Sequence, residues 1–173
     1  MLEQDAPTEP VHAPLVPASV TLPEITLKAV VLSILLAAVL AGANAYLGLF
    51  AGMTVSASIP AAVVSMAVLR LFRQSNILEN NIVQTAASSG EALAAGVIFT
   101  IPGLVLIGYW TSFDYWHTFT VSLVGGVLGV LFTIPLRRAL IIHARLRFPE
   151  GVATAEVLKV GASSDAGAGG RVR

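Results

Sequence analysis

The stretch from Ala29 to Leu69, AVVLSILLAAVLAGANAYLGLFAGMTVSASIPAAVVSMAVL, contains no Asp, Glu, Lys or Arg. A helix needs about 20 apolar residues to cross a bilayer, so this stretch is long enough for two crossings. The whole chain is 55% hydrophobic and 12% charged, against roughly 25% charged residues in an ordinary soluble domain. The sequence therefore predicts an all-α integral membrane protein, a polytopic bundle of about four transmembrane helices.

The first two expected crossings lie in this stretch and its flanks. The first covers about residues 25–49 and the second about residues 53–72. Pro60 falls in the first turns of the second crossing, where Ser56, Ser58 and neighbouring helices can bond the backbone groups that a proline leaves free. We therefore expect one helix over the whole of the second crossing.

The last clear crossing covers residues 119–142. It contains Gly125 and Gly129, whose spacing of four residues suits close contact with another helix. A short helix is expected over residues 148–161, with Pro149 at its start.

Residues 76–108 form a region that is too long for one straight crossing of about 20 residues. Two arrangements fit its polar start and apolar end. Either an interfacial helix precedes a crossing that begins near Glu91, or a re-entrant helix enters the bilayer and breaks around residues 88–90. The sequence leaves both open.

The basic residues predict the orientation in the membrane. With four crossings, the bases that flank the spans all fall on one side, and the rule that cytoplasmic loops are rich in Lys and Arg places both termini of the chain in the cytoplasm. We therefore expect a multi-pass protein of the cell (inner) membrane, in contact with the lipid bilayer. The bases concerned are Lys28, Arg70, Arg73, Arg137, Arg138, Arg145, Arg147 and Lys159.

The two ends differ in composition from the membrane region. Residues 1–23 are acidic and rich in proline, without a basic residue, and are expected to be a disordered tail. Residues 24–161 form the transmembrane region, and residues 162–173 read as a flexible Gly-rich tail. The net charge of zero argues against a nucleic-acid partner.

Polar side chains inside a membrane are costly and are candidates for function. On an uninterrupted helix Asn76, Asn80, Gln84 and Glu91 fall within a sector of about 80° and could line a path. The alternative is an amphipathic helix at the membrane surface whose amides face water. Glu91 lies directly before an apolar run, where it could take up and release a proton, or it could simply be an acid in the first turn of a helix.

No arrangement for catalysis or for a metal is present in the sequence. There is no cysteine, and the three histidines, at residues 12, 117 and 143, lack the spacing of metal ligands. The chain has no Gly-x-Ser-x-Gly, P-loop or His-Glu-x-x-His motif. We expect neither catalytic residues nor a cofactor, and the protein is not predicted to be an enzyme.

Five blocks of sequence, in order, resemble the start of the oligopeptide transporter (OPT) family. They are GMTVSASIPAA at residues 52–62, NILENNIVQT at 76–85, GEALAAGVIFT at 90–100, IPLRR at 134–138 and FPEGVATAEVL at 148–158. The resemblance implies a secondary transporter for small peptides, or for metal chelates in the yellow-stripe-like branch, driven by protons.

The resemblance also adds candidates for a substrate or coupling region. These are Glu150 in the Pro149-Glu150-Gly151 turn and Glu156 in the same helix, because transporters build such sites from broken polar helices at membrane depth. Glu79 lies off the polar stripe, and an interfacial ion pair with Arg70 or Arg73 is expected for it.

Family members are much longer than this chain, so we expect a fragment whose partners are the remaining helices of a full-length transporter. The alternative is a small membrane subunit or scaffold that does not transport and that helps a larger complex to assemble. Transport requires Glu91 and the amides to face a water-filled cavity, whereas a scaffold requires only packing surfaces.

Overall fold

The computed structural model describes residues 15–17, 19–72, 75–146 and 148–167, and every regular element in these ranges is a helix. The elements are α1 Leu27–Ala51, α2 Ser58–Leu69, α3 Ile77–Leu106, α4 Tyr115–Arg137, the π-helical turn η1 Arg138–His143 and α5 Pro149–Gly167. Within the described residues, α1, α3 and the continuous run of α4 with η1 are long and apolar enough to cross a membrane. The predicted all-helical membrane bundle is confirmed.

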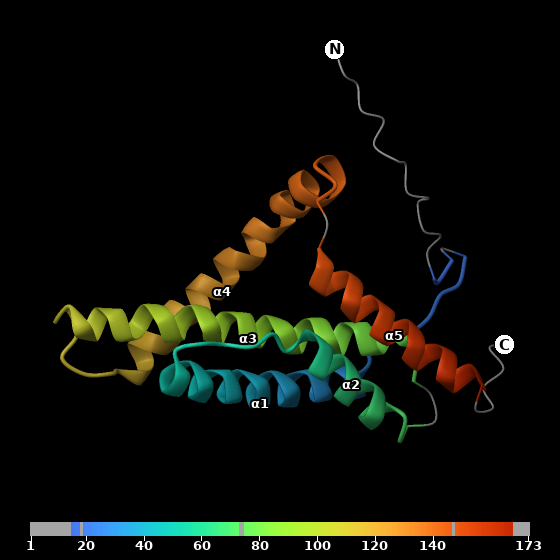
Figure 1. The fold of residues 1–173 in the computed structure, drawn as a ribbon, viewed down its shortest axis with the longest axis horizontal. Helices are drawn as coiled ribbons and strands as arrows, with labels where there is room; N and C mark the ends of the chain where they lie inside the picture. The colour runs from blue at the N-terminus through green and yellow to red at the C-terminus, as the bar shows by residue number, and fades with distance from the viewer. Residues whose placement is uncertain (1–14, 18, 73–74, 147, 168–173) are drawn as a thin grey trace, which may run out of the picture.

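Helices α1 and α3 run parallel to each other and form the closest-packed part of the molecule (Figure 1). A Cβ added at Gly90 would lie 3.0 Å from the Cβ of Ala37, and one added at Gly48 would lie 2.9 Å from Cγ2 of Ile98. Small residues at the contact let two membrane helices approach closely and gain dispersion energy over their length. A buried cluster forms where both helices meet α2, from Ala29, Leu69 and Val83 with Leu32 and Leu36.

Local signals set the ends of these helices. Thr26 caps α1 by accepting a hydrogen bond from the N–H of Ala29, and Gly52 ends it with a left-handed φ of 69°. Asn76 and Glu79 form a reciprocal capping box at the start of α3.

The second crossing differs from the expected helix over residues 53–72. Helix α2 begins only at Ser58, and residues 53–57 form a non-helical segment. The reason is Pro60, which has no N–H and whose ring would clash with the carbonyl of residue 56 if the helix continued backwards.

The non-helical segment nevertheless returns the chain across the bundle. Because α1 and α3 are parallel, the chain between them must travel back along their length, and Figure 1 shows residues 53–57 and then α2 doing so. Five extended residues span about 16 Å and a twelve-residue helix about 18 Å, and together these match a hydrocarbon core of about 30 Å.

The break expected at residues 88–90 is wrong, and no separate helix precedes the apolar run, whereas the depth at which the polar start lies in the membrane stays a prediction. Helix α3 is a single helix of 30 residues without a break at residues 88–90, and it continues through Pro102. At about 1.5 Å per residue, it is long enough to cross the bilayer and to project beyond it. Packing against α1 along its length explains why the Ser-Ser-Gly stretch stays helical, because Gly90 is used for contact rather than for a bend.

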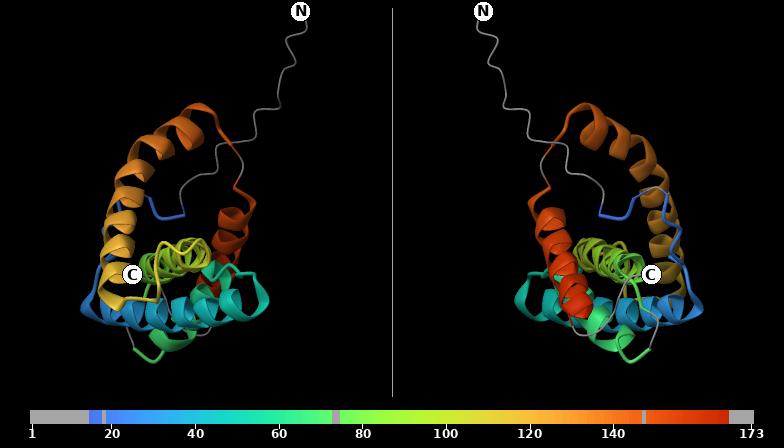
Figure 2. Two further views of the ribbon diagram at one scale, coloured as in Figure 1. Left: turned by 90° about the vertical axis from the view of Figure 1, so that its left-hand side faces the viewer. Right: turned by 90° about the vertical axis from the view of Figure 1, so that its right-hand side faces the viewer.

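Helices α4 and α5 lie on opposite sides of α3 when the bundle is viewed along that helix (Figure 2). No residue of α4 is buried, and a Cβ added at Gly125 or Gly129 would meet nothing within 4 Å in the described part of the chain. The close contact expected at these two glycines remains a prediction.

Helix α5 begins at Pro149, as expected, and packs on α2 and α3. It extends to Gly167, into the segment 162–173 for which a flexible tail is expected. Residues 168–173, together with residues 1–14 and 18 of the expected acidic tail, lie outside the described residues.

Candidate functional site

The non-helical segment is held in place by Asn44 of α1. The side-chain amide of Asn44 donates to the carbonyl of Val55 at 2.8 Å, and its oxygen accepts from the N–H of Val55 at 3.0 Å. Asn44 is only 4% exposed. Backbone groups outside a helix must find hydrogen-bond partners at membrane depth. The side chain of Asn44 is the partner of both the N–H and the carbonyl of Val55, as the backbone of a neighbouring β-strand would be.

Glu150 of α5 meets this segment where it turns into α2. The hydroxyls of Ser56 and Ser58 both donate to Oε1 of Glu150, the second at 2.7 Å. Ser88 of α3 lies 3.0 Å from the oxygen of Ser58. Since the single proton of Ser58 is used on Glu150, Ser88 is the donor in this pair. Ser56 and Ser58 thus hold one carboxylate oxygen of α5, and Ser88 of α3 bonds to one of these two serines.

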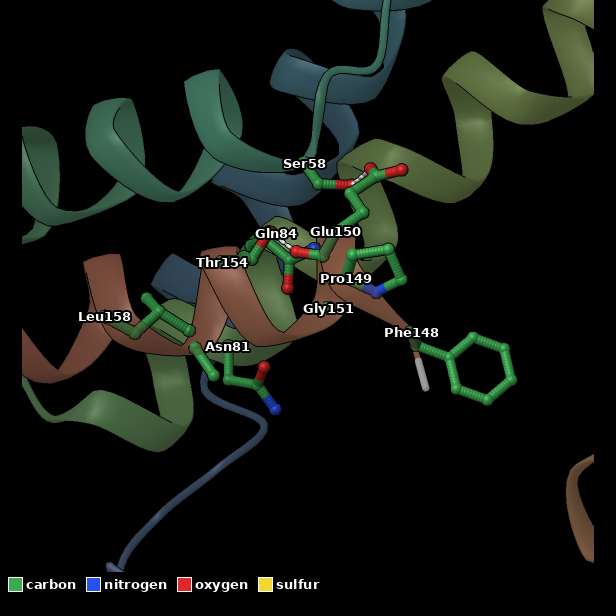
Figure 3. Close-up of a pocket in the computed structure, with 10 residues that line it drawn as sticks. Ser58, Asn81, Gln84, Phe148, Pro149, Glu150, Gly151, Thr154 and Leu158 are labelled. Atoms are coloured by element: carbon green, nitrogen blue, oxygen red, sulfur yellow. Dashed lines mark hydrogen bonds between the residues drawn. The ribbon is translucent and has the colours of Figure 1, made fainter. Parts of the chain in front are cut away.

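A cavity of about 580 Å³ lies beside this carboxylate. Its size is within the range of roughly 300–1,000 Å³ that is usual for small-molecule sites. Figure 3 shows Ser58 and Glu150 pointing toward one another, whereas Phe148 points away from the group. The cavity is lined by Ser58, Asn81, Gln84, Phe148, Pro149, Glu150, Gly151, Thr154, Ala155 and Leu158.

The cavity carries one formal charge, that of Glu150, and no Lys, Arg or His is among its lining residues in the described chain. The hydrogen bonds from Ser56 and then Ser58 lower the pKa of Glu150 below its usual value, because they stabilise the ionised form. Only Oε1 of this carboxylate takes part in these bonds, and Oε2 makes no hydrogen bond with any described residue. The site therefore presents a fixed carboxylate with one oxygen open to a ligand.

The predicted polar stripe lies on one continuous helix, but its members have different surroundings. Asn76 caps α3 and donates to the carbonyl of Pro23 at 2.8 Å. Asn80 is 7% exposed and accepts a hydrogen bond of 3.0 Å from the hydroxyl of Ser65. Gln84 alone of these amides lines the cavity with Glu150.

Glu91 lies one turn beyond Ser88 on α3 and is 8% exposed. Its carboxylate makes no hydrogen bond or ion pair with the residues that the structure describes. Glu91 therefore lies in the packed part of α3, next to the serines beside the cavity.

Two other acids lie away from the cavity. Glu156 forms an exposed ion pair of 2.7 Å with Lys159. Glu79 is 1% exposed and pairs with Lys28 at 3.1 Å, so the expected pairing with Arg70 is wrong, and Arg73 lies outside the described residues. The parallel packing of α1 and α3 explains the difference, because it brings the starts of these two helices together.

Comparison with known proteins agrees with this architecture. The sequence profile described as "OPT oligopeptide transporter protein" matches residues 24–172, most of the chain. The chain belongs to the oligopeptide transporter family.

A curated member of the oligopeptide transporter family, a Haemophilus influenzae protein with the name "Putative oligopeptide transporter", is 56% identical over 124 residues. The match covers 72% of this chain and 19% of that relative, so the chain spans less than a fifth of the relative's length. No solved structure matches the chain.

Several residues of this site in the oligopeptide transporter chain were not singled out from the sequence. Asn81 and Thr154 line the cavity, and Asn44 holds the segment that precedes Ser58. In the sequence Asn44 stands out as an amide in an apolar run. Its partner could not be predicted, because Asn44 bonds to the backbone of Val55 and not to a side chain. The described residues contain no group of His, Cys, Asp and Glu suited to a metal ion.

Proposed function

We propose that this chain forms part of a secondary transporter that moves small peptides across the cell membrane. The cavity between α2, α3 and α5 forms part of the substrate path, and the remaining helices of the full-length transporter complete it. The name of the Haemophilus influenzae relative supports peptides as the substrate class.

The observation that carries this proposal is the broken second crossing. A non-helical segment beside Asn44 is followed by the start of α2, and a cavity lined by Ser58 and Glu150 lies at that junction. Many secondary transporters form their binding sites at discontinuous helices, next to non-helical backbone. A scaffold subunit would need no such cavity, because packing surfaces alone serve it.

The charge distribution supports the orientation. If residues 53–69 cross the membrane together with the three long apolar helices, then Lys28 at the start of α1, Arg70 after α2, and Arg137 and Arg138 at the end of α4 lie on one side of it. Because cytoplasmic loops are rich in Lys and Arg, we propose that both ends of this chain face the cytoplasm and that the chain lies in the inner membrane.

Glu91 is the residue that couples transport to protons in this proposal. It is buried, lies one turn from the serines at the cavity, and has no bonded partner among the described residues. Neutralising it should uncouple transport from the proton gradient without closing the substrate path.

The test is uptake of labelled trialanine into vesicles that contain the complete gene product carrying this chain. We expect an imposed proton gradient to drive accumulation in the wild type, and Glu91→Gln to lose accumulation but retain exchange of peptide across the membrane. Glu24→Gln, an exposed acid before α1, is the control and should accumulate peptide normally.

The outcomes separate the two parts of the proposal. Accumulation in Glu91→Gln equal to that of the wild type would refute the coupling role. Absence of both accumulation and exchange in the wild type would refute transport of small peptides.

A further inference from the structure

The carboxylate of Glu150 has a geometry suited to binding a cation rather than to carrying a proton. Two serine hydroxyls fix Oε1, so the orientation of the carboxylate is set before a ligand arrives. Oε2 is left without a hydrogen bond to any described residue, and the side chain lines the cavity. Preorganisation of this kind reduces the ordering cost of binding.

The other lining residues indicate what kind of cation fits. Gln84 and Asn81 place amide groups on the α3 side of the cavity, and Leu158, Ala155 and Pro149 give it apolar surface. Amides suit the N–H and C=O groups of a peptide backbone, and apolar surface suits its side chains.

A metal ion fits this site less well. Ca²⁺ takes six to eight oxygen ligands and Mg²⁺ six, whereas here one carboxylate oxygen is already occupied by two hydroxyl donors. The serine protons point at the carboxylate, so the lone pairs of the serines do not converge on a common point with Oε2.

We infer that Glu150 binds the free α-ammonium group of the peptide substrate, with Gln84 and Asn81 beside the first peptide groups. This inference rests on the proposed transport of peptides and adds the chemical group by which they are recognised. The ammonium supplies the missing charge partner in a cavity whose described lining holds no Lys, Arg or His.

The inference predicts discrimination by a single chemical change in the substrate. Acetylation of the amino terminus removes the positive charge and two of the three N–H donors, which leaves Oε2 of Glu150 without a charged partner. A hydrogen bond to a charged group is strong enough for a difference of at least about tenfold between the two substrates.

The experiment measures uptake of labelled trialanine and of N-acetyl-trialanine by the complete gene product in vesicles, with sodium and then potassium as the external salt. In the wild type we expect trialanine to be preferred by at least about tenfold, in either salt. Glu150→Gln should raise KM for trialanine and shrink this preference to less than about twofold. The control is Glu24→Gln, an exposed acid before α1 that does not line the cavity, which should keep the wild-type preference.

The results distinguish this inference from the proposal on which it rests. Equal uptake of the two substrates by the wild type would overturn ammonium recognition and leave peptide transport standing. A preference that depends on sodium would overturn it as well, because the cation at Glu150 would then be a metal ion. Uptake of neither substrate would overturn both the transport and the inference. The wild-type comparison needs no variant, so a folding defect of Glu150→Gln does not affect it.

Discussion

The α1–α3 pair and helix α4 solve the same problem, crossing a membrane, in different ways. Along α1 and α3, glycine and alanine bring the backbones together, and buried polar groups join the two helices at one end. Helix α4 is as apolar as α1 but buries none of its residues in the described structure. It leaves the bundle at an angle (Figure 1).

The difference shows that apolar composition alone does not define the packed core of this protein. In a bilayer an apolar side chain gains little by moving from lipid to a neighbouring helix, so small residues and polar contacts decide which helices associate. The α1–α3 pair has both kinds of contact. Helix α4 leaves its apolar surface exposed in the described part of the chain.

The largest expected effect is at the ion pair that joins the starts of α1 and α3. Lys28→Met removes the cation beside Glu79, which is 1% exposed, and leaves a buried carboxylate without its charge partner. We expect a loss of about 3 kcal/mol in the free energy of unfolding, measured by titration with sodium dodecyl sulfate in mixed micelles.

Lys159→Met is the matched control, because Lys159 and Glu156 form an exposed pair with side chains 45% and 60% exposed. Exposed pairs contribute about 0–1 kcal/mol, so this variant should unfold almost as the wild type does. Equal losses in the two variants would mean that the buried position of the Lys28 pair has no special role.

The next effect is expected at the closest helix contact. Gly90→Leu adds a side chain where even a Cβ would lie 3.0 Å from Ala37, so α1 and α3 must move apart. We expect a loss of about 2 kcal/mol by overpacking. Gly96→Leu, on the same helix with nothing within 4 Å of its added Cβ, should be close to neutral. A neutral Gly90→Leu would contradict the close packing of the pair.

A somewhat smaller loss is expected where α1 holds the non-helical segment. Asn44→Leu leaves the N–H and the carbonyl of Val55 without their partner, at a cost of about 1–2 kcal/mol. Asn44→Asp keeps the acceptor and should fall between Asn44→Leu and the wild type. Ser33→Ala serves as the control, since among the described residues the Ser33 hydroxyl bonds only to the carbonyl of Ala29 in its own helix. An Asn44→Leu variant as stable as Ser33→Ala would show that the two hydrogen bonds between Asn44 and Val55 do not stabilise the protein.

The smallest effect is expected on α4. Gly125→Leu and Gly129→Leu add side chains in open space, so the unfolding of this chain should change by less than about 0.5 kcal/mol. A loss as large as that of Gly90→Leu would show that α4 is packed as closely as the α1–α3 pair and would remove the contrast between them.

The sequence predicted the membrane bundle and most helix positions, because hydrophobic runs and capping residues are local signals. It did not predict the break before Ser58, although Pro60 and Gly52 both stand in the sequence, because a proline in a membrane helix is often tolerated. The continuity of α3 was also missed, since it depends on contact between Gly90 and Ala37, which are far apart in the chain.

The candidate site was predicted only in part, because it too depends on contacts between residues that are far apart in the chain. The sequence singled out Gln84 and Glu150, and the structure brings them to one cavity. It grouped Asn76 and Asn80 with Gln84 and Glu91 by helical phase, yet Asn76 caps α3 and Asn80 bonds to Ser65. Phase shows which residues share a face of a helix, but the neighbour that covers each part of that face is a tertiary feature.

The most direct test of the account is whether the cavity beside the broken crossing holds water in the membrane. The chain has no cysteine, so Gln84→Cys introduces a single thiol at the cavity. Two other positions on α3 are the controls. Val83→Cys lies at a buried position, and Phe99→Cys replaces a side chain that is 55% exposed. We expect a charged methanethiosulfonate reagent to modify the thiol of Gln84→Cys rapidly and trialanine to protect this thiol. The thiols of both control variants should stay unmodified. A Gln84→Cys variant that is as unreactive as the controls would contradict the account.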